Sequence, residues 1–227
     1  MSRIECFGLF LILCCIPGPA QDHPEQAVPE GPLIVNARVI AQRYCHVDPE
    51  AFSVFMDVDL RFTNTTDQPV ILSRHVEPGG ARVARDVEAA KLGDFEVEPS
   101  GDYFPVTLPP VPKFGAAPDS KDFVVLAPHA SYETRVSSGV IGILDAAKAK
   151  KGSGFIARGT HVLQIEVDLW PFGWPYFVGE VDAQKTSERW RAYGHLATGT
   201  IDTDFAPFTI PEKFPNPQCP QPKVKRR

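Results

Sequence analysis

Apolar and polar residues alternate most regularly over residues 52–62. The even positions of this segment are all apolar, whereas the odd positions are polar apart from Phe55. Because successive side chains of a strand point to opposite faces, this alternation predicts a strand with one buried and one solvated face. Turn-forming residues follow at 64–68, and an apolar run resumes at 70–72 after Pro69. The pattern therefore predicts a strand, a turn and a second strand.

Similar patterns recur along the rest of the chain. A second strong alternation covers residues 159–170, and weaker strand patterns lie at residues 33–44, 82–87, 95–98, 123–126, 132–136 and 196–210. About seven short strands joined by Pro- and Gly-containing turns predict an all-β fold. The expected architecture is a two-sheet antiparallel immunoglobulin-like sandwich with irregular loop insertions and one short helix. A closed barrel is the alternative.

The segments between these strands contain sequence patterns that predict helices, a turn and an extended loop. Residues 89–92 predict one helical turn, and residues 140–151 predict a short helix that ends at the Gly-Ser-Gly sequence 152–154. The Pro-Gly-Gly sequence at 78–80 predicts a turn. Residues 105–118 are rich in proline and predict an extended loop.

Composition narrows the class of protein. The chain has 227 residues, of which 43% are hydrophobic, so it can bury one sizeable core. The 23 prolines are about twice ordinary usage, which disfavours long helices. The formal net charge of −5 provides no basic face for phosphates, so nucleic acid is not an expected partner.

Residues 1–20 have the features of a secretory signal peptide. Arg3 precedes an apolar run at residues 7–16, and small residues stand before the expected cut. The apolar run is too short for a hydrocarbon layer of about 30 Å, so no permanent membrane span is expected after cleavage. The predicted location is therefore secreted or periplasmic, in the cell envelope. Lipoprotein anchoring at Cys14 or Cys15 is the disfavoured alternative, because neither cysteine follows a Gly, Ala or Ser.

The chain then divides into four segments. They are the signal peptide 1–20, a flexible lead-in 21–32, the β-sandwich domain 33–211 and a proline-rich, basic tail 212–227. Removal of the leader leaves Cys45 and Cys219, which form a natural disulfide pair in an oxidising compartment. Closing so long a loop would contribute about 4 to 5 kcal/mol at most. Two unpaired thiols are the alternative.

The stretch that best predicts a function is residues 170–193. It contains all three tryptophans of the chain, and prolines and a glycine interrupt any regular strand among its aromatic residues. Rings that project from a loop can stack on sugar rings or anchor a protein partner. The predicted ligand-binding residues are Trp170, Phe172, Trp174, Tyr176, Trp190 and Tyr193. A loop that folds back over the open end of the sandwich is the alternative that we favour.

Sequence patterns that would indicate catalysis, metal binding or glycosylation are weak or missing. Local motifs for nucleophilic catalysis, zinc or phosphate binding are missing, so an enzyme is disfavoured and no cofactor is expected. The histidines have no metal-ligand spacing, so no metal is expected either. Asp57 and Asp59 predict a charged solvent face with cross-strand partners rather than a calcium site. Asn64 heads an N-glycosylation acceptor pattern, although a role in forming the turn is favoured.

Three groups of turn residues have a spacing that is similar to that in a known family of domains. The first group is Asn64, Thr66, Asp67, Pro69 and Val70, the second is Leu126, Pro128 and Ser131, and the third is Gly159, His161 and Leu163. Their layout resembles that of secreted bacterial immunoglobulin-like β-sandwich domains, including the intracellular proteinase inhibitor family. The resemblance covers roughly half of the mature chain and consists of turn chemistry, which implies a fold rather than an activity.

The predicted function is therefore that of an exported, non-enzymatic β-sandwich that binds or scaffolds a partner. The expected partner is a protein or a carbohydrate, bound by the aromatic stretch 170–193. A proteinase inhibitor, which would present a rigid loop such as residues 105–118, is the alternative. A hydrolase built on a sandwich scaffold is a further alternative.

Overall fold

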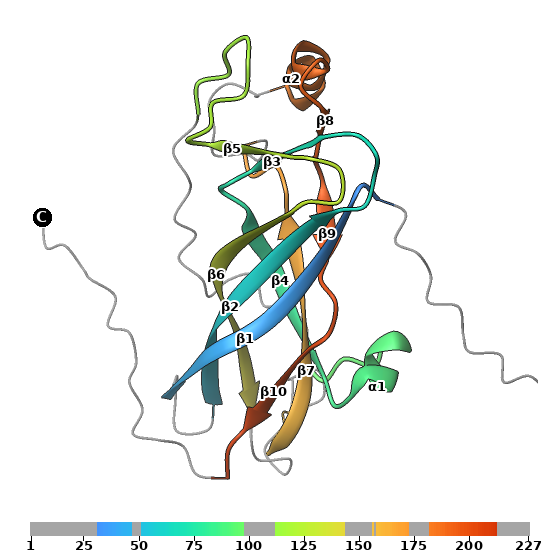
Figure 1. Cartoon of the computed structure of the whole chain (residues 1–227). Coiled ribbons are helices and arrows are strands. Elements are labelled where there is room, and N and C mark those ends of the chain that lie inside the picture. The colour runs from blue at the N-terminus through green and yellow to red at the C-terminus, as the bar shows by residue number, and fades with distance from the viewer. Residues whose placement is uncertain are drawn as a thin grey trace, which may run out of the picture.

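The computed structural model describes residues 31–46, 51–97, 112–143, 156, 158–172 and 182–212. Most of these residues lie in strands, which confirms the predicted all-β class (Figure 1). The strands are β1 (Leu33–His46), β2 (Ala51–Asn64), β3 (Val70–Ser73), β4 (Glu77–Ala84), β5 (Phe123–Leu126), β6 (Ser131–Ile143), β7 (Gly159–Asp168), β8 (His195–Leu196), β9 (Thr200–Asp202) and β10 (Ala206–Ile210). In this described part of the chain they form three sheets.

The first sheet is built around β2, the strand with the clearest alternating pattern. β1 and β6 pair with β2 on either side, and both pairs are antiparallel. The alternate apolar residues of β2 are buried as predicted, and Val58, Leu60 and Phe62 are 0% exposed. Burial of each such side chain contributes about 1.5 to 3 kcal/mol, so this face fixes the register of the strand.

The opposite face of the first sheet carries cross-strand ion pairs. Arg43 donates hydrogen bonds of 2.9 Å to both carboxylate oxygens of Asp57. Arg38 and Arg135 donate to Asp59 from the two neighbouring strands, at 3.0 and 2.9 Å. The charged solvent face predicted for Asp57 and Asp59 is thereby confirmed. Hydrogen bonds from Arg135 and Arg38 lower the pKa of Asp59.

The second sheet is built around β7, the other strongly alternating strand. β4 pairs with one edge of β7, and β10 and the short β9 pair with the other. The turn predicted at residues 78–80 is wrong, because these residues belong to β4. The register shifts there between Pro78 and Gly80, and such a bulge accommodates an extra residue without ending the strand.

The main core lies between these two sheets. It joins apolar side chains of β1, β2 and β6 to those of β4, β7 and β10, among them Val35, Leu60, Phe62, Val83, Leu163, Ile165 and Phe208. β4 lies against β6, and β1 lies against β10. The backbone N–H of Asp204 also donates to the carbonyl of Val35 at 3.0 Å. The packing is that expected of a β-sandwich.

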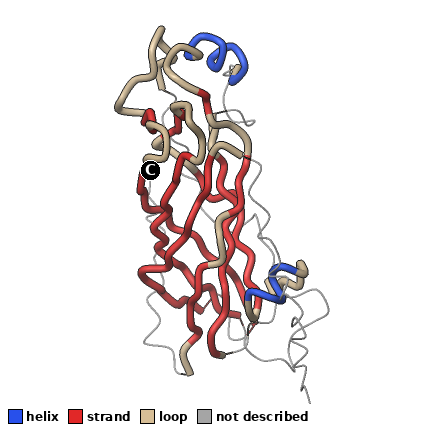
Figure 2. Tube along the Cα trace, turned by 45° about the vertical axis from the view of Figure 1, so that its right-hand side comes forward, coloured by secondary structure: helices blue, strands red, loops and turns tan. Residues whose placement is uncertain are grey.

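A third sheet lies at one end of the molecule, in addition to the two that the sequence predicts. In it β3 is flanked by β5 in antiparallel orientation and by β8 in parallel orientation. The helix α2 (Ala183–Trp190) stands at this end, whereas α1 (Val87–Lys91) lies beside the strands toward the other end (Figure 2). The third sheet thus extends the sandwich where several connecting segments meet.

The two helical predictions have different outcomes. The helical turn predicted at residues 89–92 is confirmed by α1, whose first turn is capped by Asp86 through a 2.8 Å hydrogen bond from the Ala89 N–H. The helix predicted from residue 140 is wrong as far as the structure describes it, because β6 continues to Ile143. Its last residue pairs with Ala51 of β2, and β-branched side chains favour this extended backbone.

Several predictions concern residues outside the described ranges, and they stay predictions. They are the signal peptide 1–20, the lead-in up to residue 30, the helical segment beyond residue 143, the ring positions Trp174 and Tyr176, and the Cys219 end of the disulfide with Cys45. The tail beyond residue 212 is outside these ranges as well. Within the described ranges, no helix is long and apolar enough to cross a membrane.

Candidate functional site

Three of the predicted ligand-binding rings are buried. Trp170 is 7% exposed, and Phe172 and Trp190 are 0% exposed. They form a compact cluster with Ile71, Phe123 and Leu196, against which Phe114 also packs. The rings of Phe123 and Trp190 meet edge to face with centroids 4.8 Å apart, a favourable aromatic geometry. This cluster covers the end of the sandwich, as the favoured alternative for the aromatic stretch predicts.

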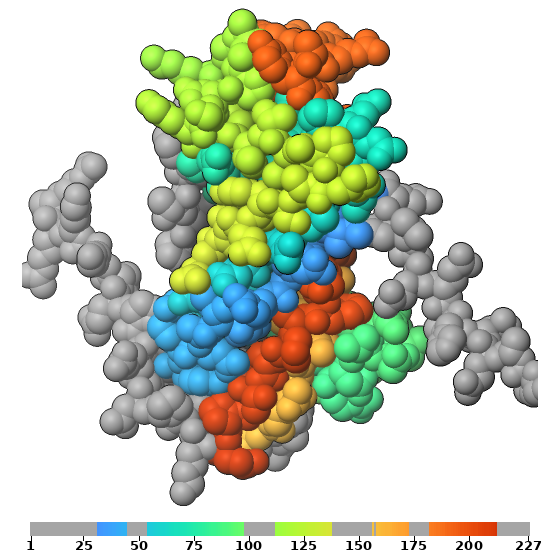
Figure 3. Space-filling view, in the orientation of Figure 1, coloured from blue at the N-terminus to red at the C-terminus, as the bar shows by residue number. Residues whose placement is uncertain are grey.

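Two side chains of α2 donate hydrogen bonds to backbone carbonyls of the segment that begins at residue 112. Trp190 donates from its indole Nε1 to the carbonyl of Gly115 at 3.1 Å. Arg189 donates from Nη1 to the carbonyl of Phe114 at 2.7 Å. Figure 3 shows α2 and this segment in contact at the end of the molecule. Of the predicted binding residues that the structure describes, only Tyr193 therefore has an exposed ring, 46% accessible.

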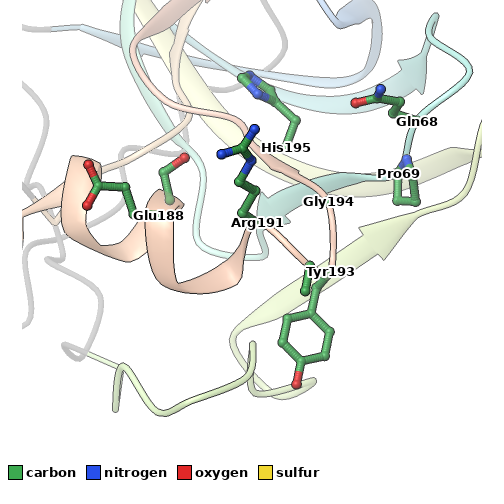
Figure 4. A pocket seen from close by; sticks show the side chains of 9 residues that line it. Gln68, Pro69, Glu188, Arg191, Tyr193, Gly194 and His195 are labelled. Atoms are coloured by element: carbon green, nitrogen blue, oxygen red, sulfur yellow. The ribbon is translucent and has the colours of Figure 1, made fainter.

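An open pocket lies beside the turn that joins α2 to β8. Its volume is about 500 Å³, within the range of small-molecule sites. One wall is formed by Ser187, Glu188 and residues 191–195, and the other by Gln68 and Pro69, which precede β3. In Figure 4 the side chains of Arg191 and His195 extend to the same side of the turn, while the ring of Tyr193 points away from both. We call this cavity the α2–β8 pocket.

Gly194 brings the two walls of the pocket together. Its φ angle is +149°, and a Cβ at this position would lie 2.5 Å from the carbonyl oxygen of Pro69. Only glycine fits so close an approach at this φ. The next residue, His195, donates its backbone N–H to the same oxygen at 2.8 Å and begins the parallel pairing with β3. The pocket is thus built by backbone contacts as well as by side chains.

Polar side chains with unused hydrogen-bonding capacity line this pocket. Among the described residues, the side chains of Gln68, Arg191 and His195 make no hydrogen bond or ion pair. In the described part of the chain, the Glu188 carboxylate accepts a single hydrogen bond of 3.3 Å, from Gln184 of the same helix. An amide, a guanidinium, an imidazole and a carboxylate are therefore available to a ligand, both as donors and as acceptors.

A second pocket begins on the other side of His195. It has a volume of about 380 Å³ and is lined by the start of β1 and by the segment that leads from β8 to β9. Its walls carry the side chains of Thr198, Thr200 and Asp202 beside those of Leu33 and Leu169. We call it the β8–β9 pocket.

Three other histidines that the structure describes lie beside carboxylates. His75 Nε2 lies 3.1 Å from Asp122, His129 Nε2 lies 3.2 Å from Asp67, and the buried His161 lies 3.1 Å from Glu96. Within the described ranges, no three His, Cys, Asp or Glu side chains come close enough to hold a metal ion.

The comparisons with known proteins add no relative. The chain matches no protein-family model, no curated protein and no solved structure.

The helix α2 and the residues it positions were missed by the sequence-based interpretation, which treated this stretch as irregular. A signal was present, since Asp182 is an N-cap whose side chain accepts from the Lys185 N–H at 3.1 Å. Thr186 and Trp190, the buried residues of the helix, are four positions apart, which is the spacing of one helical face. No local sequence pattern indicates that Gln68 lines the same pocket as Arg191 and His195, because Gln68 is far from both in the sequence.

Proposed function

We propose that this protein is an exported, non-enzymatic binding module with an immunoglobulin-like sandwich, and that the α2–β8 pocket is its binding site. Two facing sheets with a shared core support the sandwich assignment. The observation that carries the proposal is the convergence of Gln68, Arg191 and His195, without partners among the described residues, in an open pocket. Surface polar groups gathered in a concave site are typical of ligand recognition.

A fragment screen followed by amide chemical shifts tests the binding site. Polar fragments are expected to shift the amides of residues 187–195 and of Gln68. An Arg191→Ala variant is expected to weaken their binding about tenfold, which is the loss of one hydrogen bond to a charged group. Arg61→Ala, an exposed arginine on another face, is the control and should change nothing. Fragments that shift no amide around the pocket would refute the proposed site.

Export is supported by the features of residues 1–20. Protein recovered from the cell envelope or the medium should begin at Gln21 when its N-terminal sequence is determined. Mass spectrometry of the same material without reduction should show a peptide pair linked through Cys45 and Cys219. Recovery of the chain from the cytoplasm with Met1 in place would contradict export.

Proteinase inhibition is the second candidate, and one observation favours it. The carbonyls of Phe114 and Gly115 are held by α2, while Lys113 and residues 115–117 are exposed. An exposed segment fixed at its backbone is what a protease cleft requires of an inhibitory loop. Trypsin, which cleaves after basic residues, is the relevant protease for Lys113. If trypsin keeps full activity in the presence of excess protein, inhibition through Lys113 is eliminated, and the same result with every serine protease tested eliminates the candidate.

A further inference from the structure

The N-glycosylation acceptor pattern of the chain lies in the turn between β2 and β3. It consists of Asn64, Thr65 and Thr66. Glycosylated asparagines normally lie at the protein surface, because the attached sugar is bulky and polar. The Asn64 side chain is instead 0% exposed, whereas Thr65 beside it is exposed. The turn therefore lies at the surface, while the acceptor atom points into the protein.

Glycosylation would consume a hydrogen that the folded protein uses. In this reaction an Nδ2–H bond of the asparagine breaks, and so does the bond between the first sugar carbon and the pyrophosphate of a lipid-linked oligosaccharide. A bond from Nδ2 to that carbon forms, the pyrophosphate leaves with its electron pair, and the proton is released. The Asn64 amide has two hydrogens, and Nδ2 donates to the carbonyls of Gln68, Leu126 and Ala127 at 2.8, 3.3 and 3.1 Å.

The other required residue of the pattern is engaged as well. The Thr66 hydroxyl donates to Oδ1 of Asn64 at 2.9 Å and to the carbonyl of Gln68 at 3.0 Å. The backbone N–H of Asn64 donates to the carbonyl of Ala130 at 3.0 Å. In the folded protein an enzyme therefore meets neither a free amide nor a free hydroxyl.

From these contacts we infer that N-glycosylation of Asn64 and folding exclude each other. Leu126 and Ala127, whose carbonyls enclose the amide, are 62 and 63 positions away in the sequence. The acceptor is therefore open in the unfolded chain and closes when the β2–β3 turn packs against the turn between β5 and β6. A glycan attached before that point leaves buried carbonyls without donors and keeps the two turns apart. The inference does not depend on the α2–β8 pocket.

The turn between β5 and β6 provides a matched exposed acceptor. The His129 side chain is 67% exposed, and its φ angle is +60°. The His129→Asn substitution creates the acceptor pattern Asn-Ala-Ser at positions 129–131. Asparagine tolerates this backbone conformation, and loss of the exposed contact with Asp67 costs little. Two acceptors in neighbouring turns then differ in burial.

Expression through the secretory pathway of a eukaryotic cell tests the inference. Folded monomers of wild type and His129→Asn are separated from aggregated or unfolded chains by size exclusion and verified by cooperative thermal unfolding. A glycosidase that converts each glycan-bearing Asn to Asp then marks modified positions for mass spectrometry. In folded monomers we expect a glycan at position 129 of the variant and none at Asn64. Glycans at Asn64 should occur only in chains that have not folded.

The variant must fold for this comparison. Both proteins are therefore also made in bacteria that lack the glycosylating enzyme, where their thermal unfolding should coincide. If His129→Asn does not fold, Thr198→Asn takes its place, because it creates the pattern Asn-Gly-Thr at the exposed positions 198–200.

Two results would overturn the inference. The first is a folded monomer that carries a glycan at Asn64 and unfolds at the temperature of the unmodified protein. The second is a folded variant whose exposed new acceptor stays unmodified, because burial would then not be the reason that Asn64 is bare. A modified position 129 together with an unmodified Asn64 in every fraction supports the inference, since the turn then closes before the enzyme acts.

Discussion

At the scale of single residues, the buried side chain of Asn64 links two turns of the fold. Its side chain is 0% exposed and donates from Nδ2 to the carbonyls of Gln68 at 2.8 Å and Ala127 at 3.1 Å. Its Oδ1 accepts from the Thr66 N–H at 2.9 Å. One amide therefore joins the β2–β3 turn to the turn between β5 and β6. The favoured role of Asn64 as a turn former is confirmed.

Replacement of Asn64 by Asp should be strongly destabilising. The carboxylate keeps the shape of the amide but cannot donate, so it would face the carbonyl oxygens of Gln68, Leu126 and Ala127. We expect a loss of about 3 kcal/mol in the free energy of unfolding, measured by denaturant titration. Gln68→Glu makes the same chemical change at an exposed side chain of the same turn and should cost less than about 0.5 kcal/mol. Equal losses in the two variants would contradict the role assigned to Asn64.

At the scale of elements, the third sheet depends on one glycine. Gly194 lets β8 approach β3 closely enough for the parallel pair between Val70 and His195 to form. The buried ring of Trp190 anchors α2 just before that turn. The α2–β8 pocket therefore exists because a helix end and a two-residue strand are held against Pro69.

Replacement of Gly194 by Ala should weaken the pairing of β8 with β3. The added Cβ would clash with the Pro69 oxygen, so we expect a loss of about 2 kcal/mol and faster amide exchange in β8. Gly93→Ala is the matched control, because Gly93 also has positive φ, +76°, but nothing lies within 4 Å of the added atom. A control that loses as much stability as Gly194→Ala would show that backbone conformation alone, and not contact with Pro69, explains the effect.

The elements differ in how far the sequence could predict them. β2 and β7 were predicted because each strand has one face in the core and one in contact with solvent. Apolar and polar residues therefore alternate along both strands. β8 has two residues, too few for any pattern, and its position follows from pairing with a distant strand. The aromatic stretch was recognised, yet composition cannot tell a ring that faces solvent from one that packs inward. Burial of Trp190 depends on α2 and on Phe123, which lies far away in the sequence.

At the scale of the whole molecule, carboxylates on the two main sheets respond to pH in opposite directions. Glu77 of β4 lies directly across from Asp168 of β7. Burial raises the pKa of Glu77, and the charge of Asp168 raises it further. Burial also raises the pKa of Asp168, against a hydrogen bond from the Trp170 N–H that lowers it. On the first sheet, burial raises the pKa of Asp57, but its bonds to Arg43 and other partners outweigh burial and lower it overall.

These directions give a pH test of stability. A carboxyl group with a raised pKa in the folded state stabilises the fold below its ordinary pKa, and this contribution is lost as pH rises through the folded-state pKa. Glu77→Gln, which imitates the protonated form, should therefore stabilise the protein by about 0.5 kcal/mol at neutral pH and have little effect near pH 3.5, below the ordinary pKa of Glu.

Asp57→Asn is the comparison with the opposite sign. Because the pKa of Asp57 is lowered, its contribution is present above the ordinary pKa of Asp and is lost as pH falls. The variant should be less stable than wild type at neutral pH, with the difference vanishing in acid. Thermal unfolding curves across the pH range measure both variants, and parallel pH profiles for the two would overturn the assignment.

The pairing of β7 also sets the order in which the protein can acquire its structure. β7 joins β4, far earlier in the sequence, to β9 and β10, which follow it. Among the described strands, those that pair with β7 are all distant from it in the sequence, so the second sheet is complete only when β10 (Ala206–Ile210) is in place. Contacts between distant segments slow folding. If the chain is exported as we propose, late completion of the second sheet would keep it unfolded long enough to pass through a translocation channel.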